Sequence, residues 1–251
     1  NDEFVLYFQP QLDLNDSSIN SVEALIRWQH PRRGLLPPVD FIPLAEESGR
    51  ITDIGRWVVM AACRQLAKWQ KGPYSHLRIA VNLSGRELDD ESIVDHIQEA
   101  LESNGVPASR LEVELTEEIF IQNIEHNLNQ LTKLHKLGVH LAIDDFGVGY
   151  SSLGYLRDFP VDLLKIDRSF ITDVTERHDD AVITRAVINL AHNLGIQVVA
   201  EGVETHEQLT FLKNHRCDLI QGYLISRPIP AGELERALSA GLLEIDTPVG
   251  S

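Results

Sequence analysis

Short apolar segments typical of strands alternate with amphipathic segments typical of helices along nearly the whole 251-residue chain. Eight strands are predicted at residues 4–14, 21–28, 77–83, 110–115, 139–144, 161–166, 196–200 and 218–220. Helices are predicted at residues 40–47, 52–71, 87–103, 123–137, 151–157, 179–194, 206–214 and 231–240. Because no linker or low-complexity run interrupts this alternation, it indicates one α/β domain over residues 1–251. Eight such strands favour a closed TIM-type (βα)8 barrel.

The connection between the first two strands restricts the barrel further. Only a short turn at residues 15–18 joins them. A parallel pair needs a crossover of about a dozen residues or more, so these two strands must be antiparallel. We therefore expect a modified barrel whose first strand runs against the others.

Composition excludes several classes of protein. A net charge of −16 disfavours binding to DNA or RNA polymers, although bound cations could reverse the field locally for one small phosphodiester. No apolar run is long enough to span a bilayer, and the acidic start of the chain is unlike a signal peptide. The two cysteines lie far apart and form no disulfide framework. We expect a cytoplasmic domain cut from a longer protein, which could itself be anchored to a membrane.

One strand ends in two adjacent carboxylates, Asp144 and Asp145, which are followed by Phe146, Gly147, Val148 and Gly149. On an ideal strand the two carboxylates would point to opposite faces. Both reach the barrel mouth only if the chain turns there, and the glycines permit such a turn. By itself the stretch fits either a metal site beside a loop or a solvated turn.

Other predicted strands also end in polar residues, and in a barrel these ends converge on one mouth. The candidates for metal binding are Glu23, Asn82, Glu114, Asp144, Asp145 and Glu201. Any one of them could be a solvated loop residue, but the whole set would repel itself without cations. Hard oxygen ligands favour Mg²⁺ or Mn²⁺ over Zn²⁺, and several carboxylates suit two ions bridged by an aspartate. In this acidic mouth Lys165 should stay charged, so it would orient water or stabilise negative charge rather than act as a free base.

These strand ends together resemble the EAL-domain cyclic di-GMP phosphodiesterases. The resemblance covers Gln9-Pro10 to Arg227-Pro228. Its motifs are Glu23-Ala-Leu25 with Arg27-Trp28, Asn82-Leu-Ser84, Glu114-Leu-Thr-Glu117, Asp144-Asp-Phe-Gly-Val-Gly149, Lys165-Ile-Asp167, Glu201-Gly-Val-Glu204 and Gln221-Gly-Tyr223. It implies a barrel with one antiparallel strand and hydrolysis of cyclic di-GMP to linear 5'-pGpG with Mg²⁺ or Mn²⁺.

The resemblance also implies roles for individual residues. One metal would be held by Glu23, Asn82, Glu114 and Asp144, and a second by Asp144 and Asp145 with Glu201 helping directly or through water. Lys165 and Glu201 would serve catalysis, and Glu117 would anchor the loop that contains Phe146, Gly147 and Gly149. The implied substrate contacts are Gln9, Ala24, Leu25, Arg27 on a phosphate oxygen, Asp167, Glu204, Gln221 and Tyr223.

Departures from the family pattern are small: Gln11 replaces a usually apolar residue, and Val148 stands where Thr or Ala is common. Family members often form homodimers and carry sensory or regulatory domains upstream, so we expect both. Two alternatives stay open. One is an inactive receptor for cyclic di-GMP on the same scaffold, although no metal ligand is missing. The other is an enolase-type lyase with one metal, which fits the composition but not the aspartate pair.

Overall fold

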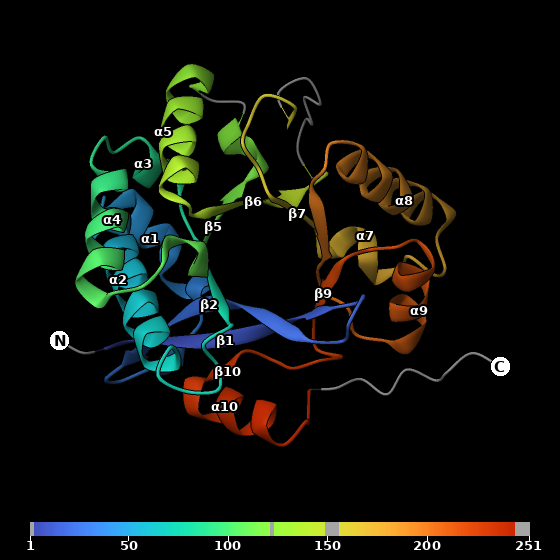
Figure 1. Ribbon diagram of the computed structural model, residues 1–251, viewed down its shortest axis with the longest axis horizontal. Helices are drawn as coiled ribbons and strands as arrows, with labels where there is room; N and C mark the ends of the chain where they lie inside the picture. The colour runs from blue at the N-terminus through green and yellow to red at the C-terminus, as the bar shows by residue number, and fades with distance from the viewer. Residues whose placement is uncertain (1–2, 121–122, 149–155, 244–251) are drawn as a thin grey trace.

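The computed structural model describes residues 3–120, 123–148 and 156–243, and its centre is a closed barrel (Figure 1). Around the barrel the order is β1-β9-β8-β7-β6-β5-β4-β2, and β2 pairs again with β1. The strands are β1 Phe4–Asp13, β2 Ile19–His30, β4 Arg78–Asn82, β5 Leu111–Thr116, β6 His140–Phe146, β7 Leu163–Ile166, β8 Gln197–Ala200 and β9 Leu219–Gln221. The predicted α/β barrel is confirmed.

Strand β1 is antiparallel to both of its barrel neighbours, β2 and β9. The six other neighbouring pairs of barrel strands are parallel. The turn after β1 closes with a hydrogen bond from the Asp13 amide to the Ser18 carbonyl at 2.9 Å. The reversed first strand predicted from this short turn is therefore confirmed.

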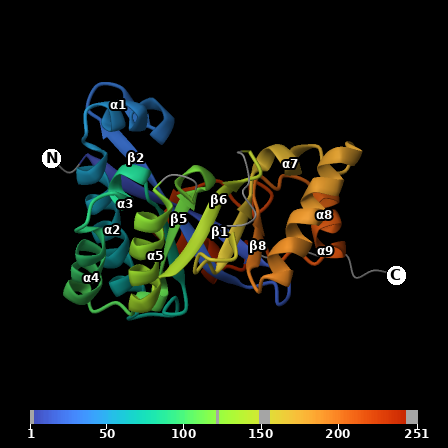
Figure 2. The ribbon, with the colours of Figure 1, turned by 90° about the horizontal axis from the view of Figure 1, so that it is seen from above.

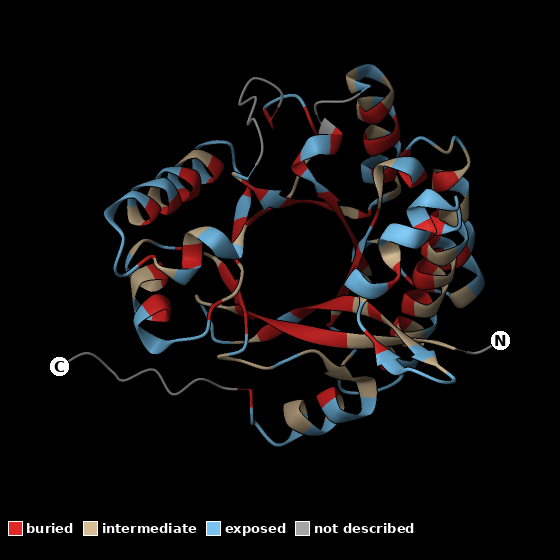
Figure 3. Cartoon of the chain, turned by 180° about the vertical axis from the view of Figure 1, so that it is seen from behind, coloured by how far each residue is buried: buried red, intermediate tan, exposed pale blue. Residues whose placement is uncertain are grey.

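Helices cover the outside of the barrel, and the ring of strands between them is largely buried (Figure 3). The helices are α1 Ile42–Glu47, α2 Ile51–Trp69, α3 Gly85–Leu88, α4 Ile93–Asn104, α5 Ile124–Leu137, α7 Arg168–Thr172, α8 His178–Asn193, α9 His206–Asn214 and α10 Ala231–Ser239. Short 3₁₀ turns lie at η1 Pro38–Asp40, η2 Ala108–Arg110 and η3 Glu117–Phe120. Among the described helices, none combines the length and the apolar character needed to cross a membrane.

The helix predicted at residues 87–103 is wrong as a single element, because the structure divides it into α3 and α4. The carboxylate of Asp90 accepts hydrogen bonds from the amide of Ser92 at 3.0 Å and from its hydroxyl at 2.6 Å. Such local bonds compete with helical bonds and end α3. A hydrogen bond from the Ile93 amide to the Asp90 carbonyl, 3.0 Å long, then leads into α4.

The sequence did not predict two short strands, β3 Gly34–Leu36 and β10 Ile229–Pro230, or the short helix α7. Strand β3 pairs with the extended end of β2, and β10 pairs with β1 across most of the chain. Helix α7 begins directly after the predicted strand end, with the carboxylate of Asp167 accepting from the amide of Ser169 at 3.0 Å. Of the helix predicted at 151–157, residues 151–155 lie outside the described part of the chain.

The barrel interior contains a small apolar cluster that is separate from the main core. Its members are Ala142, Leu163, Val199 and Leu219. Each stands two residues before the polar residue at the end of its strand. Because side chains alternate along a strand, residues two apart share a face. The polar strand ends therefore lie on an apolar floor inside the barrel.

Candidate active site

Each barrel strand supplies one polar side chain to a shared network at one end of the barrel. The eight residues are Gln9, Glu23, Asn82, Glu114, Asp144, Lys165, Glu201 and Gln221. Hydrogen bonds and ion pairs connect all of them. The structure thus brings the predicted strand ends together, with Gln9 and Gln221 included.

Lys165 lies at the centre of this network, and its side chain is only 1% exposed. Its ammonium nitrogen is 2.8 Å from Glu114 Oε2, 2.8 Å from Glu201 Oε1, 3.1 Å from Asp144 Oδ1 and 3.7 Å from Glu23 Oε2. An ammonium group has three N–H donors, and three of these oxygens lie within hydrogen-bonding distance. The lysine therefore cross-links side chains from four other strands or strand ends.

The charges in this buried cluster are strongly coupled. Burial alone would lower the pKa of Lys165, but the surrounding carboxylates, led by Asp144, outweigh it and hold this pKa well above the usual lysine value. Burial raises the pKa of Glu114 well above its usual range. Burial also raises the pKa of Glu201 to about 8, against the opposing effect of Lys165 and with added repulsion from Asp144. One lysine does not neutralise the cluster.

The Asp144-Asp145 pair turns the chain at the end of β6. Asp145 has a φ of +54°, in the left-handed region, and the β6–β7 register shifts between Ile143 and Phe146. The Asp145 amide donates to Asp144 Oδ1 at 3.0 Å. Sequence reasoning assigned this turn to the following glycines, whereas the structure begins it at Asp145 itself and continues it at Gly147, whose φ is +100°.

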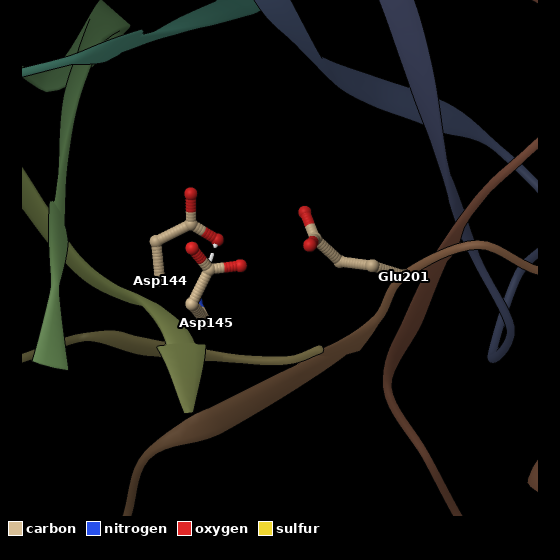
Figure 4. A group of neighbouring side chains, drawn as sticks. All are labelled: Asp144, Asp145 and Glu201. Carbon is tan, nitrogen blue, oxygen red and sulfur yellow. Dashed lines mark hydrogen bonds between the residues drawn. The ribbon is translucent and has the colours of Figure 1, made fainter. Parts of the chain in front are cut away.

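Because of this turn, both aspartates face the carboxylate of Glu201 across the mouth (Figure 4). One oxygen from each of Asp144, Asp145 and Glu201 lies within 4.8 Å of the others. Burial and the nearby Asp144 raise the pKa of Asp145. Three convergent carboxylates of this kind are suited to a hard divalent cation.

Glu23 is held by side-chain amides on both of its carboxylate oxygens. The amide of Asn82 donates to Glu23 Oε1 at 2.8 Å, and the amide of Gln221 donates to Oε2 at 2.5 Å. Burial alone would raise the pKa of Glu23, but Lys165 and these two donors outweigh it, so the pKa is lowered. Glu23 is thus an ionised ligand candidate, held 3.7 Å from the ammonium of Lys165.

One observation tests whether this group of side chains fits metal ions. Glu114 is fully buried, and its Oε1 atom has no hydrogen-bond partner among the described residues. An unpaired buried carboxylate oxygen is costly unless a cation or donor reaches it. The candidate donors are five carboxylates and one amide, and all can offer oxygen. The residues therefore fit one or two hard divalent cations.

A cavity of about 500 Å³ opens above the carboxylates. Six of the predicted substrate contacts line it: Gln9, Leu25, Asp167, Glu204, Gln221 and Tyr223. The metal candidates Glu23, Asp144, Asp145 and Glu201 line it as well. Predicted metal ligands and predicted substrate contacts therefore share one cavity.

Three of the other predicted residues lie away from this cavity. Ala24 and Asn82 line an adjacent, largely apolar cavity of about 420 Å³ between the barrel rim and α1 and α2. The guanidinium of Arg27 donates to the Ile26 carbonyl at 2.9 Å and lies 5.6 Å from the centre of the Tyr7 ring. In this structure Arg27 is not among the residues that line either cavity.

Glu117 contacts the turn that follows β6. Its Oε2 accepts a hydrogen bond from the Gly147 amide at 3.0 Å, and Phe146 is buried beside this turn. A side chain at Gly147 would also meet Phe170, since a Cβ built there lies 2.9 Å from the ring. Gly149, the other predicted loop residue, lies outside the described residues.

Sequence reasoning missed several residues around the cavity. Arg168, Ser169 and Thr172 of α7 line it, and Arg227 stacks over Tyr223 with 4.1 Å between the guanidinium carbon and the ring centre. The signal for the first two was their position directly after Lys165-Ile-Asp167 at a strand end. Arg227 is close only because the chain returns to the mouth after β9.

Comparisons with known proteins agree with this geometry. The family model described as EAL domain matches residues 1–228. The chain is 46% identical over 250 residues to the cyclic di-GMP phosphodiesterase NbdA of Pseudomonas aeruginosa, covering 100% of this chain and 32% of NbdA. It is 41% identical over 237 residues to the cyclic di-GMP phosphodiesterase PdeR of Escherichia coli, covering 94% of this chain and 35% of PdeR. The chain thus spans about a third of the length of these relatives.

Solved structures have the same architecture. The PaMucR phosphodiesterase in complex with c-di-GMP is 42% identical, with a TM-score of 0.89 over 92% of this chain and 94% of that chain. The EAL enzyme Bd1971, with cAMP and cyclic di-GMP bound, is 32% identical, with a TM-score of 0.90 over 95% of this chain and 65% of that chain. With the family model matched along most of its length and its barrel shared with these proteins, the chain belongs to the EAL domain family.

Proposed function

We propose that this chain is a phosphodiesterase that hydrolyses cyclic di-GMP to linear 5'-pGpG with the help of divalent cations. The observation that carries the proposal is the group of carboxylates around Lys165 at the base of the 500 Å³ cavity. Membership of the EAL family and the similarity to the cyclic di-GMP phosphodiesterases NbdA and PdeR support the substrate. The activity of the whole protein is part of the same proposal.

Charge balance supports two cations. The metal candidates include five carboxylates, Glu23, Glu114, Asp144, Asp145 and Glu201, and Lys165 adds one ammonium group. When all are ionised, four negative charges remain, which two divalent ions would neutralise. We assign one ion to Glu23, Asn82, Glu114 and Asp144, and the other to Asp144 and Asp145 with Glu201. Bound Mg²⁺ or Mn²⁺ would lower the pKa of a water molecule and polarise the phosphodiester.

Lys165 acts in this proposal by orientation and charge. Its ammonium keeps its proton, because the surrounding carboxylates hold its pKa well above the usual value. It therefore cannot take a proton from water as a free base. Its contacts with Glu114 and Glu201 at 2.8 Å instead fix these carboxylates where the cations would be held and stabilise negative charge that develops nearby.

The 500 Å³ cavity is lined by groups suited to binding a guanine nucleotide. The carboxylates of Asp167 and Glu204 line it and can accept hydrogen bonds from the N–H edge of guanine. Tyr223, half exposed and stacked with Arg227, offers an aromatic surface to a base. Gln9, the cross-strand partner of Glu23, and Leu25 line the same cavity. These residues are assigned to substrate binding, and Arg27 and Ala24 join them only if the rim rearranges.

The proposal also covers the other domains, the oligomeric state, the location and the partners of the protein. Curated relatives are about three times longer than the matched region, which supports upstream sensory or regulatory domains. A homodimer and a cytoplasmic location are proposed with them. No DNA or RNA polymer is expected as a partner, because the net charge is −16.

The test is hydrolysis of cyclic di-GMP by the purified chain with Mg²⁺ or Mn²⁺, followed by chromatography of the products. We expect pGpG with either ion and none after chelation. Glu23→Ala should abolish turnover, whereas Glu99→Ala, on an exposed part of α4, should leave it unchanged. Binding of cyclic di-GMP without any pGpG after prolonged incubation would instead identify an inactive receptor.

A further inference from the structure

Two polar residues, Gln11 and Ser21, are fully buried inside the barrel and are direct cross-strand partners in β1 and β2. Neither lines the 500 Å³ cavity. Their layer lies one step below the mouth. On β2, Ser21 comes two positions before Glu23, and on the reversed strand β1, Gln11 comes two positions after Gln9. Buried polar groups in such a layer must be paired with one another or with the mouth.

Hydrogen bonds join these two residues to the mouth in a single series. The hydroxyl of Ser21 donates to Gln11 Oε1 at 2.6 Å. The amide nitrogen of Gln11 donates to Gln221 Oε1 at 2.9 Å. The amide nitrogen of Gln221 then donates to Glu23 Oε2 at 2.5 Å and to Gln9 Oε1 at 3.1 Å. The series begins in the barrel interior and ends at two residues that line the cavity.

The direction of every bond in this series follows from the charge at its end. As a carboxylate, Glu23 offers only acceptors, so Gln221 must turn its NH₂ group toward it. The oxygen of Gln221 then faces Gln11, which must present its own NH₂ group. The oxygen of Gln11 in turn faces Ser21, which must donate. Reversing Gln221 would oppose two acceptors at Glu23 and two donors at Gln11. Reversing Gln11 would oppose two acceptors at Gln221, although the Ser21 hydroxyl could still accept from it.

We propose that Gln11 and Ser21 are positioning residues that fix the amide orientation of Gln221, and through it the carboxylate of Glu23 that is presented to a divalent cation. The proposal rests on the metal-dependent function proposed above. Partners behind a ligand set its orientation and change metal affinity without touching the ion. An apolar side chain at position 11 would leave Gln221 Oε1 without its buried donor, so that only the contacts with Glu23 and Gln9 would still restrain the Gln221 side chain.

The test compares variants of the whole chain in direct Mn²⁺ titrations without substrate, with free Mn²⁺ followed by electron paramagnetic resonance. Gln11→Met should weaken Mn²⁺ binding by about 10- to 100-fold. Ser21→Ala should weaken it in the same direction by less, because only the far end of the series is lost. Since both act through Gln221, the double variant should bind Mn²⁺ no more weakly than Gln11→Met alone.

A matched control separates positioning from general stability. Gln130 is as deeply buried, at 1% exposure on α5, and its amide oxygen accepts from Lys133 at 3.2 Å, outside the mouth network. Gln130→Met should leave the Mn²⁺ dissociation constant unchanged. Equal Mn²⁺ affinity in the wild type and Gln11→Met would overturn the positioning role. If Gln11→Met does not fold, unchanged Mn²⁺ affinity in Ser21→Ala would also overturn the positioning role. A wild type that binds no Mn²⁺ would instead overturn the proposed metal centre.

Discussion

The ammonium of Lys165 lies 2.8 Å from Glu114 Oε2, and neither side chain is accessible beyond 1%. A buried pair of this kind is stable only while both partners remain. Glu114 Oε1 has no hydrogen-bond partner in the described part of the chain, so Lys165 balances only part of the negative charge of this carboxylate. This relationship makes folding and ion binding interdependent in the domain.

Replacement of Lys165 should therefore cost both activity and stability. In Lys165→Met the four neighbouring carboxylates lose their shared cation, and we expect a loss of about 3–5 kcal/mol in the free energy of unfolding without metal. Saturating Mn²⁺ should restore part of this loss, since it binds the folded chain preferentially. Chemical denaturation with and without Mn²⁺ measures the effect. Lys71→Met, at an exposed position, is the control and should change neither quantity.

Asp145 should show a conflict between function and stability that depends on pH. Its folded-state pKa is raised, by burial and then by Asp144, so its contribution to stability is present at low pH and is lost as the pH rises through that value. Asp145→Asn removes this loss and still tolerates the positive φ. Without metal, the variant should unfold at a higher temperature than the wild type at pH 7 and at nearly the same temperature near pH 3. It should also bind Mn²⁺ more weakly.

The backbone at this position supplies the contrasting variant. Asp145→Val also removes the charge, but a β-branched side chain is strained at a φ of +54°. It should lower the unfolding temperature at pH 7 although it relieves the same repulsion. If Asn and Val behaved alike, charge would dominate at this position and the strain argument would be wrong.

Glu117 should influence turnover through the loop rather than through the ions. Glu117→Ala removes the acceptor for the Gly147 amide, and displacement of the adjacent Asp145 should lower kcat by about 100-fold. Glu117→Gln keeps an acceptor oxygen and should retain much more activity. Steady-state kinetics at saturating Mg²⁺ tests the order wild type, Gln, Ala. An Ala variant with normal kcat would remove the anchoring role.

A side chain at position 55 should be destabilising because the buried carboxylate of Glu87 packs against Gly55. A Cβ at position 55 would lie 1.4 Å from Glu87 Oε1, so Gly55→Ala should cost about 1–3 kcal/mol of stability through overpacking. The cost should shrink when Glu87 is first shortened to Ser. Gly232→Ala on α10 is the matched control: nothing lies within 4 Å of its Cβ, and the helix should gain about 0.5–1 kcal/mol. Urea denaturation of the four variants measures these differences.

Local patterns were enough to predict the barrel and most of the polar mouth. The interruption of apolar strands by Glu23, Glu114 or Lys165 is visible in the sequence, and the barrel brings such strand ends together by geometry alone. The short turn before β2 likewise determined the direction of β1. Because these features depend on residues that are neighbours in the chain, they could be predicted from the sequence.

Features that depend on distant partners were not predicted. The turn at Asp145 depends on the shifted pairing of β6 with β7, and β10 forms only because it meets β1. The link from Gln11 to Gln221 joins residues 210 positions apart. The break between α3 and α4 is local, but it follows from a side-chain bond of Asp90 that an amphipathic pattern does not reveal.

The reversed first strand also determines at which end of the barrel a preceding segment would join the domain. Phe4 pairs with Trp28, far along β2 beyond Glu23, so the chain enters the barrel on the side of the mouth. Figure 2 shows the start of β1 below α1, at the end of the barrel that also carries α7. A parallel first strand would enter at the opposite, closed end. In a longer chain, any segment joined before Phe4 would leave next to the substrate opening. A signal from such a segment would then have a direct mechanical route to the rim, with no need to pass through the rigid barrel.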